Sequence, residues 1–271
     1  MHIVLAGMAG VLGCLIGGTP SFMMTGLVGI ISIVMKTTGY DTAWFDANIV
    51  NLMFLPAVMF NGAVVATTYA SKKHDIQGYE TWRSLAFTND PVVLIMASIG
   101  GIAGYCLFRL ATILQFPCDC GAFSVLTIAI ITRLLTPGKK YKKEGYEILH
   151  HLPNTLWLFH ILFAGCIAFV FAWFGEVTGN YTIGFSISAL SLILLSIDAN
   201  FPATHHITLV AGYSMMVTHS LAISVLLGIL SELLCYSFGI VYNDKCSSHL
   251  DPPTVPILLF SLILFTIQRF L

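Results

Sequence analysis

Charged residues are scarce in this chain. Only 9% of its 271 residues are Asp, Glu, Lys or Arg, whereas 57% are hydrophobic. A soluble globular domain carries about 25% charged residues, so this sequence lacks the polar surface that water requires. The apolar excess predicts contact with a lipid bilayer and leaves no room for a separate soluble domain. The net charge of −1 gives no electrostatic reason to expect nucleic acid as a partner.

Motifs of the common enzyme and nucleotide-binding classes are also lacking. The patterns G-x-x-x-x-G-K-[ST], H-E-x-x-H, G-x-S-x-G and C-x-x-C do not occur. We therefore expect that the chain does not hydrolyse ATP itself and is not an enzyme, and no cofactor is evident. The first residues, Met1 to Leu5, lack the basic region of a secretory signal peptide, which predicts that the first apolar run is retained.

Long apolar runs fill most of the sequence. A helix that crosses a bilayer needs about 20 predominantly apolar residues. We predict an all-α integral membrane protein with about nine or ten transmembrane helices. The run 207–242 is too long for one straight helix, so it is either two crossings or one crossing with a re-entrant part. The predicted spans are 3–16, 21–35, 48–70, 91–115, 121–135, 156–174, 181–197, 207–242 and 252–270, and a short surface helix is expected within 74–90.

Basic residues gather in two of the connecting segments. One segment contains Lys72, Lys73 and Arg83, and the other follows Arg133 and contains Lys139 and three further lysines. Cytoplasmic loops are enriched in Lys and Arg. We expect segments 71–90 and 137–155 to be cytoplasmic and the N-terminus to lie outside. Small size and short loops favour a bacterial cytoplasmic membrane.

The two halves of the chain resemble each other, which predicts an internal duplication. We expect a first membrane repeat at 1–136 with about five spans, a basic cytoplasmic loop at 137–155, and a second repeat at 156–271 with about four to five spans. An odd number of spans per repeat inverts the second repeat, as in many secondary transporters and some channels. The inversion implies one net crossing for 207–242. The matched positions are His2 with His160, Gly17 with Gly175, Gly26 with Gly184, Asp46-Ala47-Asn48 with Asp198-Ala199-Asn200, and Asp90-Pro91 with Asp251-Pro252.

Asp and Asn residues stand where predicted helices begin. They are favoured helix caps, since their side-chain oxygens accept hydrogen bonds from free backbone N–H groups. They would alternatively begin half-helices that dip into the membrane and direct a positive dipole end at a substrate. Asn61, beside Gly62, is expected to face a cavity. The predicted substrate-binding residues in this group are Asp46, Asn48, Asn61, Asp90, Asp198, Asn200 and Asp251.

Histidines and a glutamate distinguish the second half. Ionisable groups cost several kcal/mol in a bilayer core, so their presence indicates function or a buried partner. His205, His206, His219, Glu232 and His249 are further predicted substrate-binding residues, and His206, His219, His249 and Asp251 are a candidate metal set. His206 and His219 lie 13 residues apart, so they meet only if the segment breaks, and Gly212 offers a break. The alternative is that these histidines are hydrogen-bonded packing groups.

The prediction for function is a small secondary transporter. It would move a small solute or ion through a site near the middle of the membrane, built from both repeats. Three alternatives stay open: a channel or passive pore, a divalent-metal transporter that uses the histidines of the second half, and the membrane component of a larger complex. The expected partners are the lipid bilayer and the solute or ion, and a homo-oligomer is left open.

Overall fold

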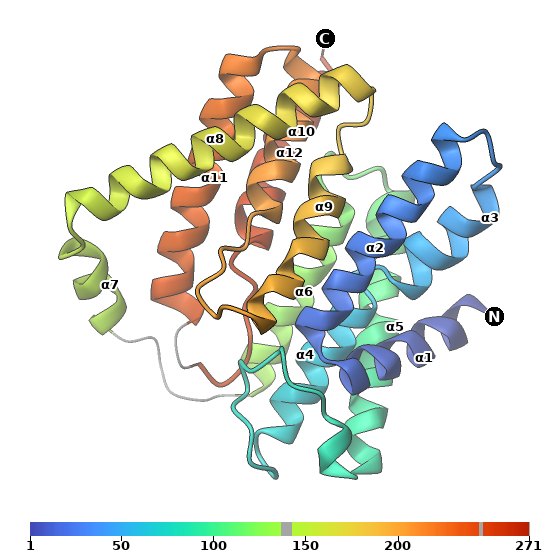
Figure 1. Cartoon of the computed structure of the whole chain (residues 1–271). Coiled ribbons are helices and arrows are strands. Elements are labelled where there is room, and N and C mark those ends of the chain that lie inside the picture. Colours follow the sequence, from blue (N-terminus) through green and yellow to red (C-terminus); the bar gives the residue numbers. More distant parts are fainter. Residues whose placement is uncertain (137–142, 244–245, 271) are drawn as a thin grey trace.

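The computed structural model describes residues 1–136, 143–243 and 246–270 (Figure 1). Within them the chain is all-helical and contains no strand. The first half contains α1 (His2–Ile16), α2 (Gly18–Thr37), α3 (Ala43–Phe45), the π-helix η1 (Asp46–Met53), α4 (Met59–Ala70), the 3-10 helix η2 (Ala86–Thr88), α5 (Pro91–Ile113) and α6 (Cys120–Leu135). The second half contains α7 (Lys143–His150), α8 (Asn154–Thr178), α9 (Ile183–Ser191), η3 (Leu192–Ser196), α10 (His205–Thr218), α11 (Leu221–Phe238), η4 (Gly239–Asn243) and α12 (Thr254–Gln268).

Four helices are long and apolar enough to cross a membrane: α2, α5, α8 and α11 together with η4. Helices α1, α6 and α12, and α9 with η3, are also apolar but contain fewer than 18 residues each, which is short of the roughly 20 that a crossing needs. The helices at the runs 3–16, 21–35, 121–135 and 156–174 extend slightly beyond the runs, whereas the runs 48–70, 181–197 and 207–242 are each divided into two helical segments.

Proline and polar caps set several of these interruptions. The predicted span 48–70 is divided, because η1 ends at Met53 and α4 begins only at Met59, with Pro56 between them. Proline removes a backbone donor and clashes with the preceding turn, which ends a helix. Asp90 caps α5 by accepting a hydrogen bond from the backbone N of Val92 at 2.8 Å. The segment expected to form a surface helix, 74–90, is instead made of turns and the short η2.

The long run 207–242 forms two helices, α10 and α11, which pack side by side. The break lies at His219, whose φ is 49°, and at Ser220, whose hydroxyl accepts from the N–H of Ile223. The expectation of a break at Gly212 is wrong. Gly212 is buried inside α10, where the helix passes so close to Tyr181 that a Cβ would lie 1.9 Å from its carbonyl oxygen.

The two halves share one order of helices and one packing pattern. In each half the first long helix packs on the third and fourth, which also pack on each other: α1 with α4 and α5, and α8 with α10 and α11. Between the halves, α2 packs on α9 and α6 packs on α12. The order therefore matches α1 with α8, α2 with α9, α4 with α10, α5 with α11 and α6 with α12.

This matching corrects one pair of sequence positions. Asp90 precedes the fourth long helix of its half, whereas Asp251 precedes the fifth. The equivalent of Asp251 is Asp119, at the start of α6, and the equivalent of Asp90 is Ser220. The predicted pairing of Asp90 with Asp251 is wrong because it treated 207–242 as a single element, while that run contains two helices.

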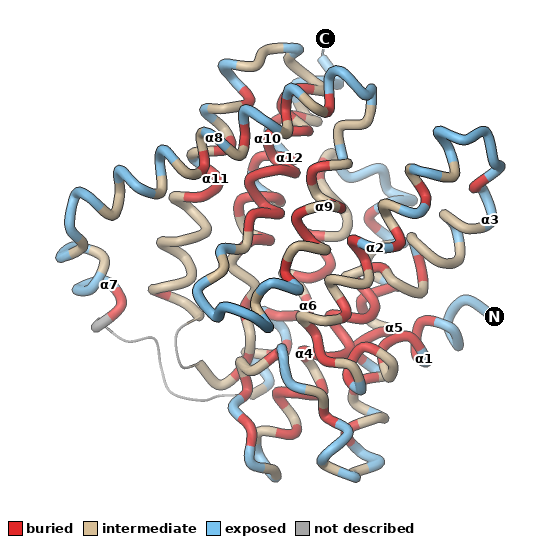
Figure 2. The backbone as a smooth tube through the Cα atoms, in the orientation of Figure 1, coloured by how far each residue is buried: buried red, intermediate tan, exposed pale blue. Residues whose placement is uncertain are grey.

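Small residues bring the helices of the first half together. A Cβ at Gly10 of α1 would lie 2.4 Å from the Ala97 carbonyl oxygen in α5, and one at Gly62 of α4 would lie 2.5 Å from the Gly10 Cα. In contrast, α8 buries little besides a row of small residues and leaves Leu162 and Trp173 exposed. Figure 2 shows buried residues concentrated in the middle of the molecule and an exposed outer side of α8.

Candidate ligand cavities between the two halves

Two cavities lie where the halves meet. The first, of about 390 Å³, is lined by the start of α6, the irregular segment before α4, and parts of α10 and α12. The second, of about 750 Å³, is lined by residues 200–206, by α8 and α11, and by the segment that leads into α12. Three residues line both cavities: Phe22, His205 and Asp251. We call these three the shared residues, because they lie between the two spaces.

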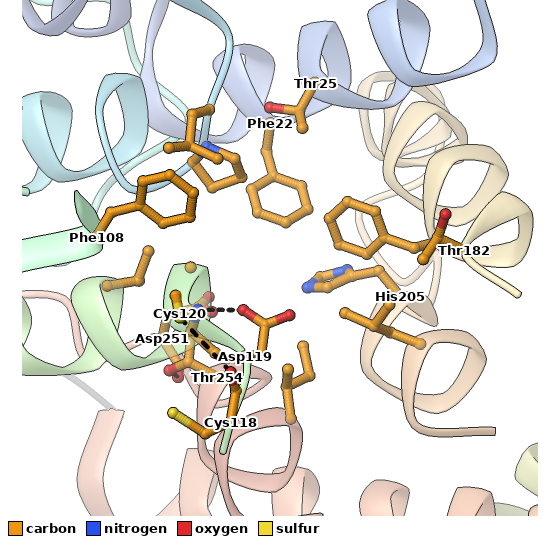
Figure 3. Close-up of a pocket in the computed structure, with 18 of the residues that line it drawn as sticks. Phe22, Thr25, Phe108, Cys118, Asp119, Cys120, Thr182, His205, Asp251 and Thr254 are labelled. Atoms are coloured by element: carbon orange, nitrogen blue, oxygen red, sulfur yellow. Dashed lines mark hydrogen bonds between the residues drawn. The ribbon is translucent and has the colours of Figure 1, made fainter. Parts of the chain in front are cut away.

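Asp119 is held firmly in the wall of the first cavity. Its Oδ1 accepts a hydrogen bond from the backbone N of Ala122 at 2.7 Å, which caps α6, and its Oδ2 accepts one from the Tyr213 hydroxyl at 2.6 Å. Figure 3 shows the side chains of Asp119 and His205 directed into the same space, with Phe22 and Phe108 beside them. A carboxylate and an imidazole therefore face a space that is otherwise largely apolar.

Glu232 binds two histidines in the wall of the second cavity. Its Oε1 lies 2.7 Å from His160 Nδ1, and its Oε2 lies 2.7 Å from His206 Nε2. Because an ionised carboxylate only accepts hydrogen bonds, both imidazole nitrogens act as donors here. The Tyr236 ring lies 4.0 Å from the His160 ring and covers this group from one side. The three side chains form a buried ionic group between α8, α10 and α11.

Two imidazole nitrogens in the first turn of α10 are buried without a hydrogen bond. They are the Nδ1 atoms of His205 and His206. His205 is 5% exposed, and its ring centroid lies 4.8 Å from that of Phe22. An unpaired buried polar atom costs about 1–3 kcal/mol, so the His205 nitrogen has capacity for a partner in the adjoining space.

Asp251 stands just before α12, and its carboxylate has one side-chain hydrogen-bonding partner among the described residues. His249 Nε2 lies 3.5 Å from its Oδ1. Arg133 of α6 holds the segment before Asp251 in place. It donates hydrogen bonds to the Ser248 hydroxyl at 3.1 Å and to the Tyr242 carbonyl at 2.6 Å. The backbone carbonyl of Asp251 accepts from the Thr254 hydroxyl at 2.6 Å. The carboxylate is thus positioned by its backbone while most of its hydrogen-bonding capacity is free.

The structure brings six of the predicted site residues together. They all line the second cavity: Asn200, His205, His206, Glu232, His249 and Asp251. Four others lie apart and make local contacts. Asp46 pairs with Lys36 at 2.8 Å, the Asn48 amide donates to the Trp44 carbonyl, and Asp198 accepts from the Asn200 backbone. Asn61 is buried in the core, where it donates to the Ala57 carbonyl rather than facing a cavity.

Asp90 is also outside both cavities. Besides capping α5, its carboxylate lies 3.1 Å from His74 Nε2. The hydrogen bond from His74, with the backbone N–H of Val92, holds the pKa of Asp90 below its usual range. Asp90 is therefore a helix cap and Asp198 holds a turn, the roles that Asp commonly has at helix ends. Asp46 instead joins η1 to Lys36 and Ser32 of α2, and Asn48 bonds to the preceding turn of its own segment.

The predicted metal set is not assembled. His206 lies in the first turn of α10 and His219 lies beyond its last turn, and an unbroken helix rises about 1.5 Å per residue, so about 20 Å separates them. His219 is exposed and lies 3.8 Å from Glu176. In the described parts of the chain no group of three or more His, Cys, Asp or Glu residues is arranged to hold a metal ion.

Several residues of these cavities were not predicted as site residues. They are Asp119, His160, Phe22 and Tyr213. His160 appears in the sequence comparison of the halves only as the partner of His2, and Asp119 does not appear there because Asp251 was paired with Asp90. Correct matching of α6 with α12 would have placed Asp119 beside Asp251.

The fold and the cavities define a helical protein of two halves with the same order of helices. Two ligand-sized cavities lie between these halves. A family model matches the chain twice, over residues 1–138 and 138–270, and is described as a family of unknown function (DUF7973). The chain belongs to this family. No curated protein and no solved structure matches it.

Proposed function

We propose that the protein spans a lipid bilayer as two repeats of opposite topology and is a secondary transporter of a small solute or ion. The observation that carries this proposal is the pair of cavities that share Phe22, His205 and Asp251. A site that borders two separate spaces is what alternating access to one binding position requires.

The topology follows from the shared order of helices. We count five crossings in each half, taking the shorter helices α1, α6, α10 and α12 as crossings and joining η1 with α4 and η3 with α9. An odd number of crossings per half would turn the second half upside down relative to the first. Irregular backbone at membrane depth is tolerated where it lines a cavity, which suits the breaks around Pro56 and Asn200. Consistent with inversion, the segment between α4 and α5 lies at the bottom of Figure 1 and the turn between α10 and α11 at the top.

The basic residues give the orientation. Lys72, Lys73 and Arg83 follow α4, and Arg133 lies in the last turn of α6. Both positions fall on one face of the proposed topology, so this face is cytoplasmic. In this topology α6 begins on the outer side at Asp119 and α12 begins on the cytoplasmic side at Asp251. The first cavity then opens outward and the second inward.

Native cysteines provide a test of the two cavities. Cys120 lines the first cavity and Cys235 lines the second, whereas Cys166 is exposed on α8 and lines neither. Three variants would each keep one of these cysteines, with the others replaced by alanine or serine. Each would be treated with a charged, membrane-impermeant thiol reagent in right-side-out and in inside-out vesicles.

The proposal predicts that Cys120 reacts from outside and Cys235 from the cytoplasmic side. Cys166 should react from neither side because it faces lipid. If Cys120 and Cys235 each react from both sides, the two spaces form one continuous path and the protein is a channel or passive pore. If neither reacts from any side, the cavities are closed and the transporter proposal fails.

A further inference from the structure

We propose that the cargo is a small organic cation, whose ammonium group binds the Asp251 carboxylate beside the Phe22 ring. This inference rests on the proposed function and names the substrate class of the same site. Three features of the cavity walls support it: their negative charge, the hydrogen-bonding capacity that Asp251 and His205 do not use within the protein, and the aromatic surface between the two spaces.

The fixed charge of both cavities is negative. Asp119 and Asp251 line the first, and Glu232 and Asp251 line the second, while neither described lining contains a Lys or Arg. Helix N-termini also border both cavities, and the Asp119 carboxylate already caps one of them, that of α6. Each described lining nevertheless carries two carboxylates and no Lys or Arg to balance them. An anionic cargo would therefore meet repulsion from both sides.

The carboxylates differ in what they can still bind. Glu232 is occupied by two imidazole groups, and Asp119 by the Tyr213 hydroxyl and the Ala122 N–H. Among the described residues, Asp251 has only His249 as a side-chain partner, at 3.5 Å, which is longer than a good N–H···O hydrogen bond. With 14% of its side chain exposed, this carboxylate is largely withdrawn from water without a close cationic partner, which is unfavourable, so Asp251 is the group that a cation would stabilise most.

His205 supplies a second, independent sign of a ligand. Its side chain is directed into the first cavity (Figure 3). The side chain is buried, and its Nδ1 has neither a hydrogen-bond partner among the described residues nor accessible surface, so the imidazole has hydrogen-bonding capacity that the protein does not use. A neutral imidazole nitrogen accepts a hydrogen bond from an ammonium N–H. His205 and Asp251 border both cavities. A cation bound between them would therefore have a path to the outer side through the first cavity and to the cytoplasmic side through the second.

Aromatic rings favour an organic cation over a bare ion. Phe22 borders both cavities, and its ring lies 5.7 Å from that of Phe185 and 6.1 Å from that of Phe60. Aromatic faces attract ammonium groups, and quaternary ammonium ligands are commonly bound in aromatic cages. The volumes of about 390 and 750 Å³ are those of small-molecule pockets, which exceed what a single hydrated metal ion needs.

Ligand binding to the purified protein in detergent tests this inference without requiring transport. The melting temperature would be followed with increasing tetramethylammonium, propylammonium, sodium, acetate and benzoate at constant ionic strength. A ligand that binds only the folded state raises the melting temperature. The expected result is stabilisation by the two ammonium ions and none by the two anions or by sodium.

Two variants locate the site. Asp251→Asn should weaken ammonium binding about tenfold or more, because it removes a charge-assisted contact. The control Asp198→Asn, at an exposed position outside both cavities, should bind as the original protein does. If Asp251→Asn does not fold, Phe22→Leu should weaken tetramethylammonium more than propylammonium, since only the ring contact is lost.

The inference is overturned if anions stabilise the protein and ammonium ions do not, or if Asp251→Asn binds ammonium with unchanged affinity. Its failure can be told from failure of the proposed function. Sided labelling of Cys120 and Cys235 combined with anion binding would keep the transporter and change its cargo. Ammonium binding combined with unsided labelling would keep the cation site and remove the transporter.

Discussion

Glu232 and its two histidines are the most consequential group at the scale of single residues. The carboxylate is nearly buried, at 9% exposure of its side chain, and His206 is buried to 1%. Removing one partner of a buried ion pair leaves an uncompensated polar group, which is strongly destabilising. The integrity of the second cavity therefore depends on this one carboxylate.

We predict that Glu232→Ala lowers the free energy of unfolding by about 3–5 kcal/mol. The matched control is Glu176→Ala, because Glu176 also pairs with a histidine, His219, but at 3.8 Å and with 41% of its side chain exposed. That control should change stability by about 0.5 kcal/mol or less. Chemical unfolding in detergent micelles measures both, and equal effects would contradict the view that Glu232 is a buried structural ion.

Residue types in the sequence pointed to one group of residues that lie together. The histidines of the second half, with nearby Asn, Glu and Asp residues, include six that line the second cavity. The sequence could not separate them from residues of the same types that lie outside the cavities, since Asp46 and Asp198 differ from Asp251 only in what surrounds them. It also could not predict that His219 points away, because that depends on where the helix ends.

At the scale of elements, apolar runs mark helices more reliably than they mark helix ends. The run 91–115 corresponds closely to α5, which has a capping aspartate and a proline at its start. The run 207–242 contained no proline or glycine at its actual break, so composition gave no sign of the turn at His219 and Ser220. Tertiary packing of α10 against α11 determines that turn.

Glycine contacts among α1, α4 and α5 give a prediction at this scale. Gly10→Ala should destabilise the protein by about 1–3 kcal/mol, because the added methyl group would overlap the backbone of α5. The control is Gly165→Ala in α8, where the nearest atom is the Ile229 Cδ1 at an ordinary 3.4 Å.

Melting temperatures of the two glycine variants in one detergent provide the comparison. The control should be unchanged or slightly stabilised, since alanine favours helix more than glycine does. If the melting temperature of Gly10→Ala equals that of the original protein, α1 and α5 are farther apart than in the structure.

At the scale of the whole molecule, the shared helix order is the basis of the account. The family model matches both halves, and the same helix pairs pack in each. The sequence predicted two repeats from weak matches, but it misaligned the last two elements because one break was invisible. The proposed inversion rests on counting crossings, so it depends on every helix of the first half that is counted as a crossing.

The most direct test of this account is the sidedness of four positions at the ends of helices. Single cysteines would replace Thr38, Lys72, Val177 and Ile197, all exposed, in a protein without native cysteines, and a membrane-impermeant thiol reagent would be applied to intact cells. Inverted repeats predict that Thr38→Cys and Val177→Cys react from outside, whereas Lys72→Cys and Ile197→Cys react only after the membrane is permeabilised. If Thr38→Cys and Ile197→Cys react from the same side, the halves are not inverted and the two cavities cannot open to opposite faces of the membrane.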